Sequence, residues 1–179
     1  MALNPMKTPA WRKRLRTALT FSLLLLTAAR VPAGEQSKQN GLTWLEFEQA
    51  MATAKKERRL LVVDFYTDWC GWCKVMERDT YGNAEVIKYA RARLVLSKVN
   101  AESSALTRYK DQSLTYRQLA LAFGVRGYPA TIFISPEGEF LTLVSGFIPP
   151  DQFLPMLEFL AEGHYKNMKY EDFLHKRKG

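Results

Sequence analysis

Two cysteines separated by two residues are the side chains of this sequence best suited to chemistry. Cys70 and Cys73 are the only cysteines in the 179-residue chain. An apolar run over residues 60–66 predicts a buried strand before them, and the residues from Lys74 onward favour a helix. A cysteine at a helix N-terminus lies where backbone N–H groups and the helix dipole stabilise its thiolate. The spacing therefore predicts a pair that alternates between dithiol and disulfide, with Cys70 as nucleophile and Cys73 as resolving thiol.

Two other uses of a cysteine pair remain open at this point. A structural disulfide would close a loop of only two residues, which removes little entropy from the unfolded chain. A zinc site needs about four ligands, and the only two histidines, His164 and His175, lie near the C-terminus. We therefore expect redox chemistry that uses no metal and no cofactor.

The net charge of +8 is unevenly distributed along the chain. Residues 1–33 contain six Lys or Arg and no acid, and residues 164–179 contain five Lys or Arg against two acids. The part between them is close to neutral. Because a nucleic-acid-binding protein needs a basic face on its folded domain, we expect no nucleic-acid partner.

Residues 1–33 have the organisation of an export signal. A basic stretch at 12–16 precedes an apolar run at 17–29 that is too short for a membrane span, and Val31-Pro32-Ala33 offers a cleavage site. The alternatives are an uncleaved anchor and an organellar transit peptide, although the leucine cluster at 23–26 favours secretion. We expect a periplasmic or otherwise extracytoplasmic protein, which an uncleaved signal would anchor to the membrane.

The remainder of the chain divides into three predicted parts. Residues 34–41 are polar and are expected to be a linker, residues 42–162 form the domain, and residues 163–179 are a basic tail that can form one more helix. Within the domain, we expect a helix over residues 43–59 and an irregular surface segment over residues 101–115.

The expected elements alternate in a way that indicates the fold class. Helices separate the early strands, which favours parallel pairing, and a turn at residues 136–138 joins two late antiparallel strands. The prediction is an α/β fold with a central mixed sheet and helices on both faces.

Several markers in this order resemble the thioredoxin superfamily over residues 42–162. Asp64-Phe65-Tyr66 precedes Trp69-Cys70-Gly71-Trp72-Cys73-Lys74 at the family's spacing, and Ser97-Lys98-Val99-Asn100 resembles its next strand. Residues 123–129 resemble the segment that carries the family's cis-proline, and Gly146 matches a later glycine. The resemblance implies the thioredoxin fold. The exported N-terminus and the helix break at Gly82-Asn83 look more like bacterial periplasmic thioredoxin-like thiol–disulfide oxidoreductases.

The resemblance also implies roles for residues around the cysteines. The family's acid at the position of Asp64 lies beneath the disulfide and moves the proton of the resolving cysteine; a hydrogen-bonded strand-edge carboxylate is the alternative. Lys98 is expected either to tune Asp64 or to face solvent. Pro129 is expected to be cis, which lets the Tyr128 backbone pair with a client segment. Around an exposed Cys70 thiol, the remaining substrate-binding residues are expected to be Trp69, Gly71 and Trp72.

These observations predict an exported enzyme that reduces or isomerises disulfides of client proteins. Its partners would be proteins with cysteines or disulfides and an upstream thiol redox partner, which could be membrane-bound. Trp72 replaces the usual proline, Tyr128 replaces a smaller residue, and Ala130 replaces threonine. Because these departures leave the direction of electron flow open, a dithiol oxidase is one alternative. A non-catalytic module that binds a client or a metal is another.

Overall fold

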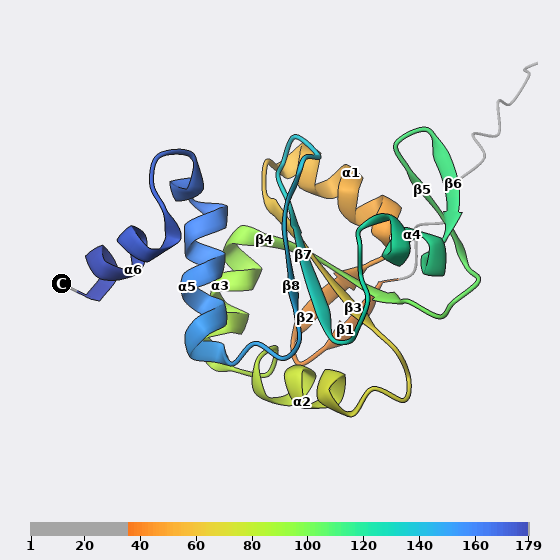
Figure 1. Cartoon of the computed structure of the whole chain (residues 1–179), viewed down its shortest axis with the longest axis horizontal. Coiled ribbons are helices and arrows are strands. Elements are labelled where there is room, and N and C mark those ends of the chain that lie inside the picture. Colours follow the sequence, from red (N-terminus) through yellow and green to blue (C-terminus); the bar gives the residue numbers. More distant parts are fainter. Residues whose placement is uncertain (1–35, 179) are drawn as a thin grey trace, which may run out of the picture. The chain divides into compact units, whose positions relative to one another are not determined.

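The computed structural model describes residues 36–178, so the predicted export signal lies outside the described residues. Figure 1 shows the elements in chain order. They are β1 (Ser37–Gln39), β2 (Leu42–Leu45), α1 (Phe47–Glu57), β3 (Leu60–Tyr66), α2 (Gly71–Asp79), α3 (Ala84–Arg93), β4 (Leu94–Asn100), β5 (Leu106–Tyr109), β6 (Gln112–Thr115), α4 (Tyr116–Ala122), β7 (Ala130–Ile134), β8 (Phe140–Ser145), α5 (Pro150–Ala161), the 3₁₀ turn η1 (His164–Lys166) and α6 (Tyr170–Lys178).

Six strands form one mixed sheet in the order β1-β2-β4-β3-β7-β8. Strands β2, β4 and β3 run parallel, whereas β1, β7 and β8 pair antiparallel with their neighbours. Strand β3 lies inside the sheet between β4 and β7, and all its residues except Tyr66 are buried. Burial on both faces explains the near-continuous apolar sequence of β3, in which Asp64 is the one charged residue.

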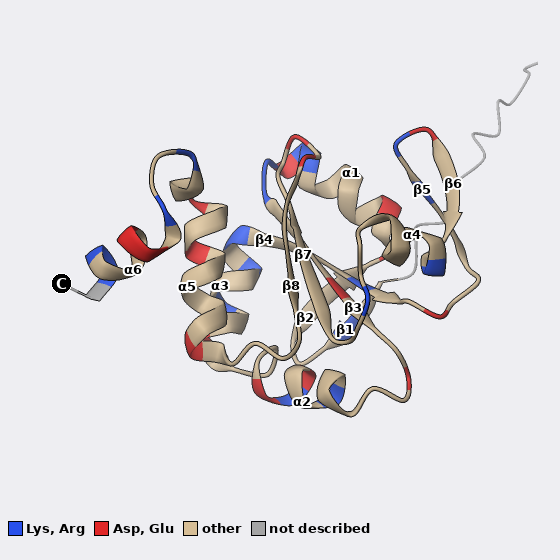
Figure 2. Ribbon diagram, viewed as in Figure 1, with Lys and Arg blue, Asp and Glu red and all other residues tan. Residues whose placement is uncertain are grey.

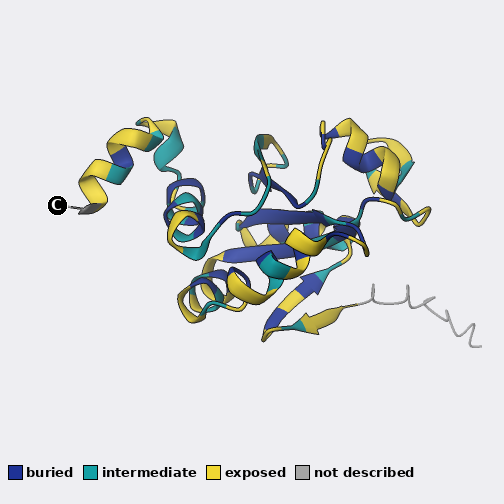
Figure 3. Cartoon of the chain, turned by 60° about the horizontal axis from the view of Figure 1, so that its bottom comes forward, coloured by how far each residue is buried: buried dark blue, intermediate teal, exposed yellow. Residues whose placement is uncertain are grey.

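Helices cover both faces of this sheet. On one face, α1 and α4 pack around Phe47 and Leu119, and on the other, α2, α3 and α5 pack around Met76 and Phe153. Figure 3 shows the central strands buried between helices whose outer sides are exposed. The predicted mixed sheet with helices on both faces is confirmed.

The start of the domain differs from the prediction. Leu42–Leu45 forms strand β2 rather than the first turn of a helix, and α1 begins only at Phe47. Within β2, Leu42 and Trp44 are buried and Thr43 is exposed, which is strand alternation over too few residues to distinguish from a helical pattern. The predicted linker was also wrong in part, because β1 pairs with β2 and extends the sheet.

The segment predicted to be irregular, residues 101–115, contains a second small sheet. Strands β5 and β6 pair as an antiparallel hairpin, with Lys110 at positive φ in the turn. Thr115 then caps α4 by accepting the N–H of Gln118 at 3.2 Å, while the Gln118 side chain accepts the N–H of Thr115 at 2.8 Å. This reciprocal capping box fixes where α4 begins.

The helix after the cysteines is interrupted, as predicted. A Cβ at Gly82 would lie 2.2 Å from the carbonyl oxygen of Arg78, so only glycine fits where the chain turns. Asn83 then caps α3, because its side chain accepts the N–H groups of Glu85 and Val86. The break returns the chain toward the sheet and leaves α2 as a short helix of nine residues.

The C-terminal tail is helical over α6 and contacts α5. The ring of Phe159 lies 5.2 Å from that of Tyr170 and 5.4 Å from that of Phe173, measured between centroids. Arg177 forms an ion pair with Glu158 at 2.6 Å. The tail is therefore packed against the last helix of the domain over its described length.

Charged residues of both signs are spread over the helices and loops that surround the sheet (Figure 2). Within residues 36–178, none of the helices has the length and the apolar character needed to cross a bilayer.

Candidate active site

The two cysteines form a disulfide at the junction between β3 and α2. Cys70 is the N-cap of α2, and its Sγ accepts the backbone N–H of Cys73 at 3.1 Å. A helix N-cap is a position where unpaired N–H groups and the helix dipole favour negative charge. After reduction, the same N–H would stabilise a thiolate at Cys70 more than one at Cys73.

The two cysteines are less exposed than predicted, since the sequence led us to expect an exposed Cys70 thiol. Cys70 is 3% exposed and Cys73 is 7% exposed, whereas the neighbouring Trp69 and Trp72 are 68% and 62% exposed. Gly71, between them, is exposed, and a Cβ there would meet no atom within 4 Å. The two cysteines are therefore recessed from solvent, whereas the neighbouring indole rings are exposed.

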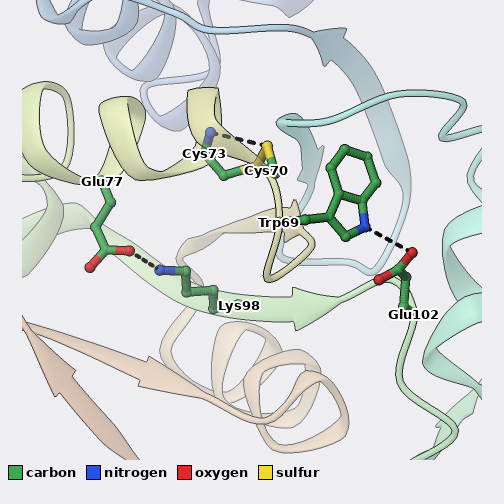
Figure 4. Close-up of a disulfide and its surroundings, with 6 residues drawn as sticks. All are labelled: Trp69, Cys70, Cys73, Glu77, Lys98 and Glu102. Carbon is green, nitrogen blue, oxygen red and sulfur yellow. Dashed lines mark hydrogen bonds and ion pairs between the residues drawn. A yellow bond between two sulfur atoms is a disulfide. The ribbon is translucent and has the colours of Figure 1, made fainter.

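Two aromatic pairs extend this exposed surface. The ring of Trp69 packs edge-on against Tyr128 with centroids 6.1 Å apart, and the ring of Trp72 lies 5.7 Å from that of Phe147. The indole N–H of Trp69 also donates to Glu102 at 3.0 Å (Figure 4). Sequence reasoning missed Phe147 and Glu102, although Phe147 directly follows the glycine recognised as a family marker.

The loop before β7 contacts the residue that precedes Cys70, because Tyr128 packs against Trp69. The peptide bond between Tyr128 and Pro129 is cis. Pro129 is buried, and its carbonyl oxygen accepts the N–H of Gly146 at 2.8 Å. That hydrogen bond joins the loop to the end of β8.

Asp64 is a buried carboxylate on the sheet face that α2 covers. Its residue is 3% exposed, and it lies opposite Lys98 of β4 and Thr131 of β7 in the sheet register. Alternation along β3 puts Asp64 on the same face as Val62, which shares a core cluster with Met76 of α2. Burial raises the pKa of Asp64 to about 7; the charge of Lys98 opposes this rise and that of Glu77 adds to it.

Lys98 does not face solvent freely. Its Nζ forms an ion pair with Glu77 of α2 at 2.7 Å (Figure 4). It also donates to Gln39 of β1 at 2.9 Å. A cavity of about 330 Å³ lies beside this pair. Its lining consists of Ser37, Lys38, Gln39, Tyr66, Thr67, Asp68, Cys73, Lys74, Glu77 and Lys98. Cys73 therefore borders a cavity with many polar lining residues, and the strand β1 that sequence reasoning missed forms one of its walls.

The fold thus brings most of the predicted site residues together. The charges of Lys98 and Glu77 act on Asp64, and Lys98 and Cys73 line the same cavity, whereas Trp69 and Tyr128 pack together next to Cys70. Among the described residues, no group of three or more His, Cys, Asp or Glu side chains is arranged to hold a metal ion.

Comparisons with known proteins agree with this geometry. The family model of the thioredoxin-like domain matches residues 47–161. A region of 122 residues, covering 66% of this chain, is 34% identical to protein disulfide-isomerase of Gallus gallus. A region of 95 residues, covering 52% of the chain, is 32% identical to thiol:disulfide interchange protein DsbD 2 of Pseudomonas aeruginosa. The matched regions span only 21% and 14% of those two relatives.

Solved structures show the same fold. A thioredoxin-fold protein from Helicobacter pylori superposes with a TM-score of 0.59 at 22% identity, covering 68% of this chain and 80% of that protein. A thioredoxin from Thermus thermophilus superposes with a TM-score of 0.54 at 22% identity, covering 65% of this chain and 85% of that one. The fold is the thioredoxin fold, and the bonded cysteine pair is of the redox type found in thiol–disulfide oxidoreductases. The chain belongs to the thioredoxin-like domain family.

Proposed function

We propose that this chain is an exported thiol–disulfide oxidoreductase that reduces or isomerises the disulfides of client proteins. The observation that carries the proposal is the position of Cys70 at the N-cap of α2, with its Sγ accepting the Cys73 N–H. A thiolate stabilised in this way is both a nucleophile and a good leaving group in thiol–disulfide exchange.

The reaction begins with the reduced dithiol. The Cys70 thiolate attacks one sulfur of a client disulfide, forms a mixed disulfide and releases the other client sulfur as a thiolate. Cys73 then loses its proton and attacks the Sγ of Cys70, which breaks the mixed disulfide and releases the second client thiolate. The client gains two electrons, and the chain ends with the Cys70–Cys73 disulfide seen in the structure.

Asp64 is proposed to accept the proton that Cys73 gives up in the second step. A carboxylate with a pKa of about 7 is poised to take and return protons near neutral pH. Burial is the main cause of this raised pKa, and the charges of Lys98 and Glu77 act on it in opposite directions. The cavity beside Cys73 provides a polar route between the resolving thiol and solvent.

The client is proposed to dock on the exposed surface around Cys70. Trp69 and Trp72 supply apolar contact area on either side of Gly71, and the backbone of Tyr128, before Pro129, pairs with an extended client segment. Phe147 extends this surface next to Trp72. Since the sulfur atoms are recessed, we expect a client cysteine in a flexible segment to react faster than one in a rigid element.

The proposed direction of electron flow is from this protein to its clients. Each reductive turnover leaves the chain oxidised, so an upstream thiol partner, which could be membrane-bound, must return it to the dithiol. Relatives named as thiol:disulfide interchange proteins and disulfide isomerases support thiol–disulfide exchange as the chemistry. A dithiol oxidase would carry electrons the other way and would have a reduction potential toward about −120 mV.

Insulin reduction with a chemical thiol as electron donor tests the proposed activity. The wild-type chain should accelerate the reduction, and the Cys70→Ser, Cys73→Ser double variant should give only the rate of the donor alone. A reduction potential determined against glutathione then separates a reductant from an oxidase. N-terminal sequencing of the protein recovered from a periplasmic extract tests export and cleavage after Ala33.

A further inference from the structure

The cavity beside the disulfide is bordered by only one of the two cysteines. Its volume is about 330 Å³, at the lower end of the range for small-molecule sites. Cys73 belongs to its lining, and Cys70 does not. Trp69 and Trp72 do not line it either, and in Figure 4 Trp69 and the Glu77–Lys98 pair extend from the cysteines in different directions. The cavity is therefore a different approach to the disulfide from the surface proposed to bind clients.

The lining of this cavity carries more positive than negative charge. It contains three lysines and two acids. Lys98 is paired with Glu77 at 2.7 Å, and the carboxylate of Asp68 accepts a hydrogen bond from a side-chain amide of β4 at 3.3 Å. The other two lysines, Lys38 of β1 and Lys74 of α2, are exposed, and neither forms an ion pair within residues 36–178. Two cations are thus available to bind the carboxylates of a ligand.

The two sulfur atoms of the disulfide are unequal as leaving groups. Sγ of Cys70 accepts the backbone N–H of Cys73 at 3.1 Å, at the N-cap of α2, so a thiolate released there is stabilised. Thiol–disulfide exchange is faster when the departing thiolate is the more stable one. Attack on Cys73 releases the stabilised Cys70 thiolate, whereas attack on Cys70 would release Cys73. The leaving-group chemistry and the cavity therefore favour the same point of attack.

We propose that the oxidised chain is reduced through this cavity by a small thiol that carries carboxylates, with the donor sulfur attacking Sγ of Cys73 and Lys38 and Lys74 binding the carboxylates. The inference rests on the proposed function, because only a chain that its clients oxidise needs a donor. It assigns the two cysteines to two different partners: the client meets Cys70 at the aromatic surface, and the donor meets Cys73 in the cavity.

The size of the cavity and the burial of Cys73 favour a small molecule over a protein as the donor. Cys73 is only 7% exposed, so a cysteine held in a folded protein would have to leave its own surface to reach it. A thiol of tripeptide size fits the volume of the cavity and brings its own carboxylates to the lysines.

The proposed reduction takes two exchange steps. In the first, a donor thiol loses its proton to solvent and its thiolate attacks Sγ of Cys73, which breaks the Cys70–Cys73 bond and releases Cys70 as a thiolate. In the second, the thiolate of another donor molecule attacks the donor sulfur of the mixed disulfide and releases Cys73, which takes up a proton. Two donor thiols become one donor disulfide, the chain gains two electrons, and Cys70 remains a thiolate.

The first test locates the sulfur that the donor attacks. Oxidised protein is mixed with glutathione, a thiol with a carboxylate at each end, quenched with acid at several early times, alkylated with N-ethylmaleimide and mapped by mass spectrometry. Early times are needed because the Cys70 thiolate can later exchange with the mixed disulfide. Extrapolated to zero time, we expect glutathione on Cys73 and the alkyl group on Cys70.

The second test removes the two cations from the cavity. In a Lys38→Gln, Lys74→Gln double variant, the rate constant for reduction of the disulfide by glutathione should fall about fivefold at low ionic strength. The rate constant with 2-mercaptoethanol, which has no carboxylate, should stay unchanged. Lys110→Gln, in the exposed turn between β5 and β6, is the matched control and should react with both thiols as the wild type does.

The outcomes separate this inference from the proposed function. Glutathione found first on Cys70 would overturn the inference, as would a double variant that loses rate equally with both thiols or with neither. Each of these results leaves the proposed function intact if the chain reduces insulin with dithiothreitol as donor. Absence of insulin reduction with dithiothreitol would overturn the proposed function, and with it the need for a donor.

Discussion

Adjacent residues of β3 face two very different environments. Val63, with Leu61 and Phe65, points to the face covered by α1 and α4, where all three are completely buried among apolar side chains. Asp64 points to the face covered by α2, toward charged and hydroxyl groups. Both faces of the strand contribute apolar burial, but the face toward α2 also holds a carboxylate whose burial opposes folding.

The difference shows how a rigid sheet can carry a destabilising group. Strand β3 is paired on both sides along its length, so its backbone position does not depend on the Asp64 side chain. The apolar face offsets the free energy that desolvation of Asp64 costs. Substitutions of Phe65 and of Asp64 should therefore change the free energy of unfolding in opposite directions.

The largest expected effect is the loss of activity on substitution of Cys70. Cys70→Ser should lower insulin reduction to the background rate because no nucleophile remains at the N-cap of α2. It should change the free energy of unfolding little, since the lost disulfide closes a loop of only two residues. The check is an assay combined with denaturant unfolding; a variant with full activity would exclude Cys70 as the attacking group.

Phe65→Ala tests the apolar face and should have the opposite profile. Loss of a fully buried phenylalanine should lower the free energy of unfolding by about 3–5 kcal/mol. The insulin-reduction rate per folded molecule should stay near that of the wild type, because Phe65 faces away from α2. A variant that loses activity while keeping its stability would contradict the division between the two faces.

Asp64→Asn should stabilise the protein in a pH-dependent way. The folded-state pKa of about 7 lies above the ordinary value of 3.8, so the folded protein binds the proton more tightly than the unfolded chain. The wild type therefore loses stability as pH rises from about 4 to 7 and loses no more above that. The variant lacks this loss and should be more stable at pH 8, by on the order of 4 kcal/mol.

Denaturant unfolding at pH 4 and pH 8 measures this effect. The stability advantage of Asp64→Asn over the wild type should be large at pH 8 and small at pH 4. Asp111→Asn, in the exposed turn between β5 and β6, is the control and should show little difference at either pH. An advantage of equal size at both pH values would mean that Asp64 is not titrating in this range.

Trp72→Ala should have the smallest effect, and on client binding only. Removing one exposed indole from the surface beside Cys70 should raise the KM for a folded client by roughly tenfold, with kcat nearly unchanged. Leu121→Ala is the control, since Leu121 is 67% exposed on α4 but lies on the other side of the sheet. Equal effects of the two substitutions on KM would argue against docking around Trp72.

The sequence predicted those helices and strands whose signals are local and strong. The long apolar run of β3, the helix start at Cys70 and the cap at Asn83 are local signals, and all three were read correctly. Strand β2 is four residues long, which is too short for its alternation to stand out from a helical pattern. The hairpin β5–β6 has exposed or half-buried residues at most positions, so its sequence resembles that of a loop.

The residues of the candidate site that lie in local sequence motifs could be predicted. Those that reach the site only through packing of distant elements could not. The cysteines, Asp64 and Pro129 lie in motifs with a recognisable spacing. Glu77 reaches Lys98 only because α2 crosses β4, and Phe147 reaches Trp72 only because the end of β8 lies beside α2. Contacts of this kind arise from the three-dimensional arrangement of elements far apart in sequence, and no periodicity encodes them.

The most direct test of the central claim is the trapping of a client on Cys70. Intact-mass spectrometry of the Cys73→Ser variant, incubated with a disulfide-containing client, should show a covalent adduct that disappears on reduction, and peptide mapping should locate it at Cys70. The Cys70→Ser variant under the same conditions should show much less adduct. Failure of Cys73→Ser to form the adduct, or equal adduct in both variants, would contradict the assignment of Cys70 as the attacking nucleophile.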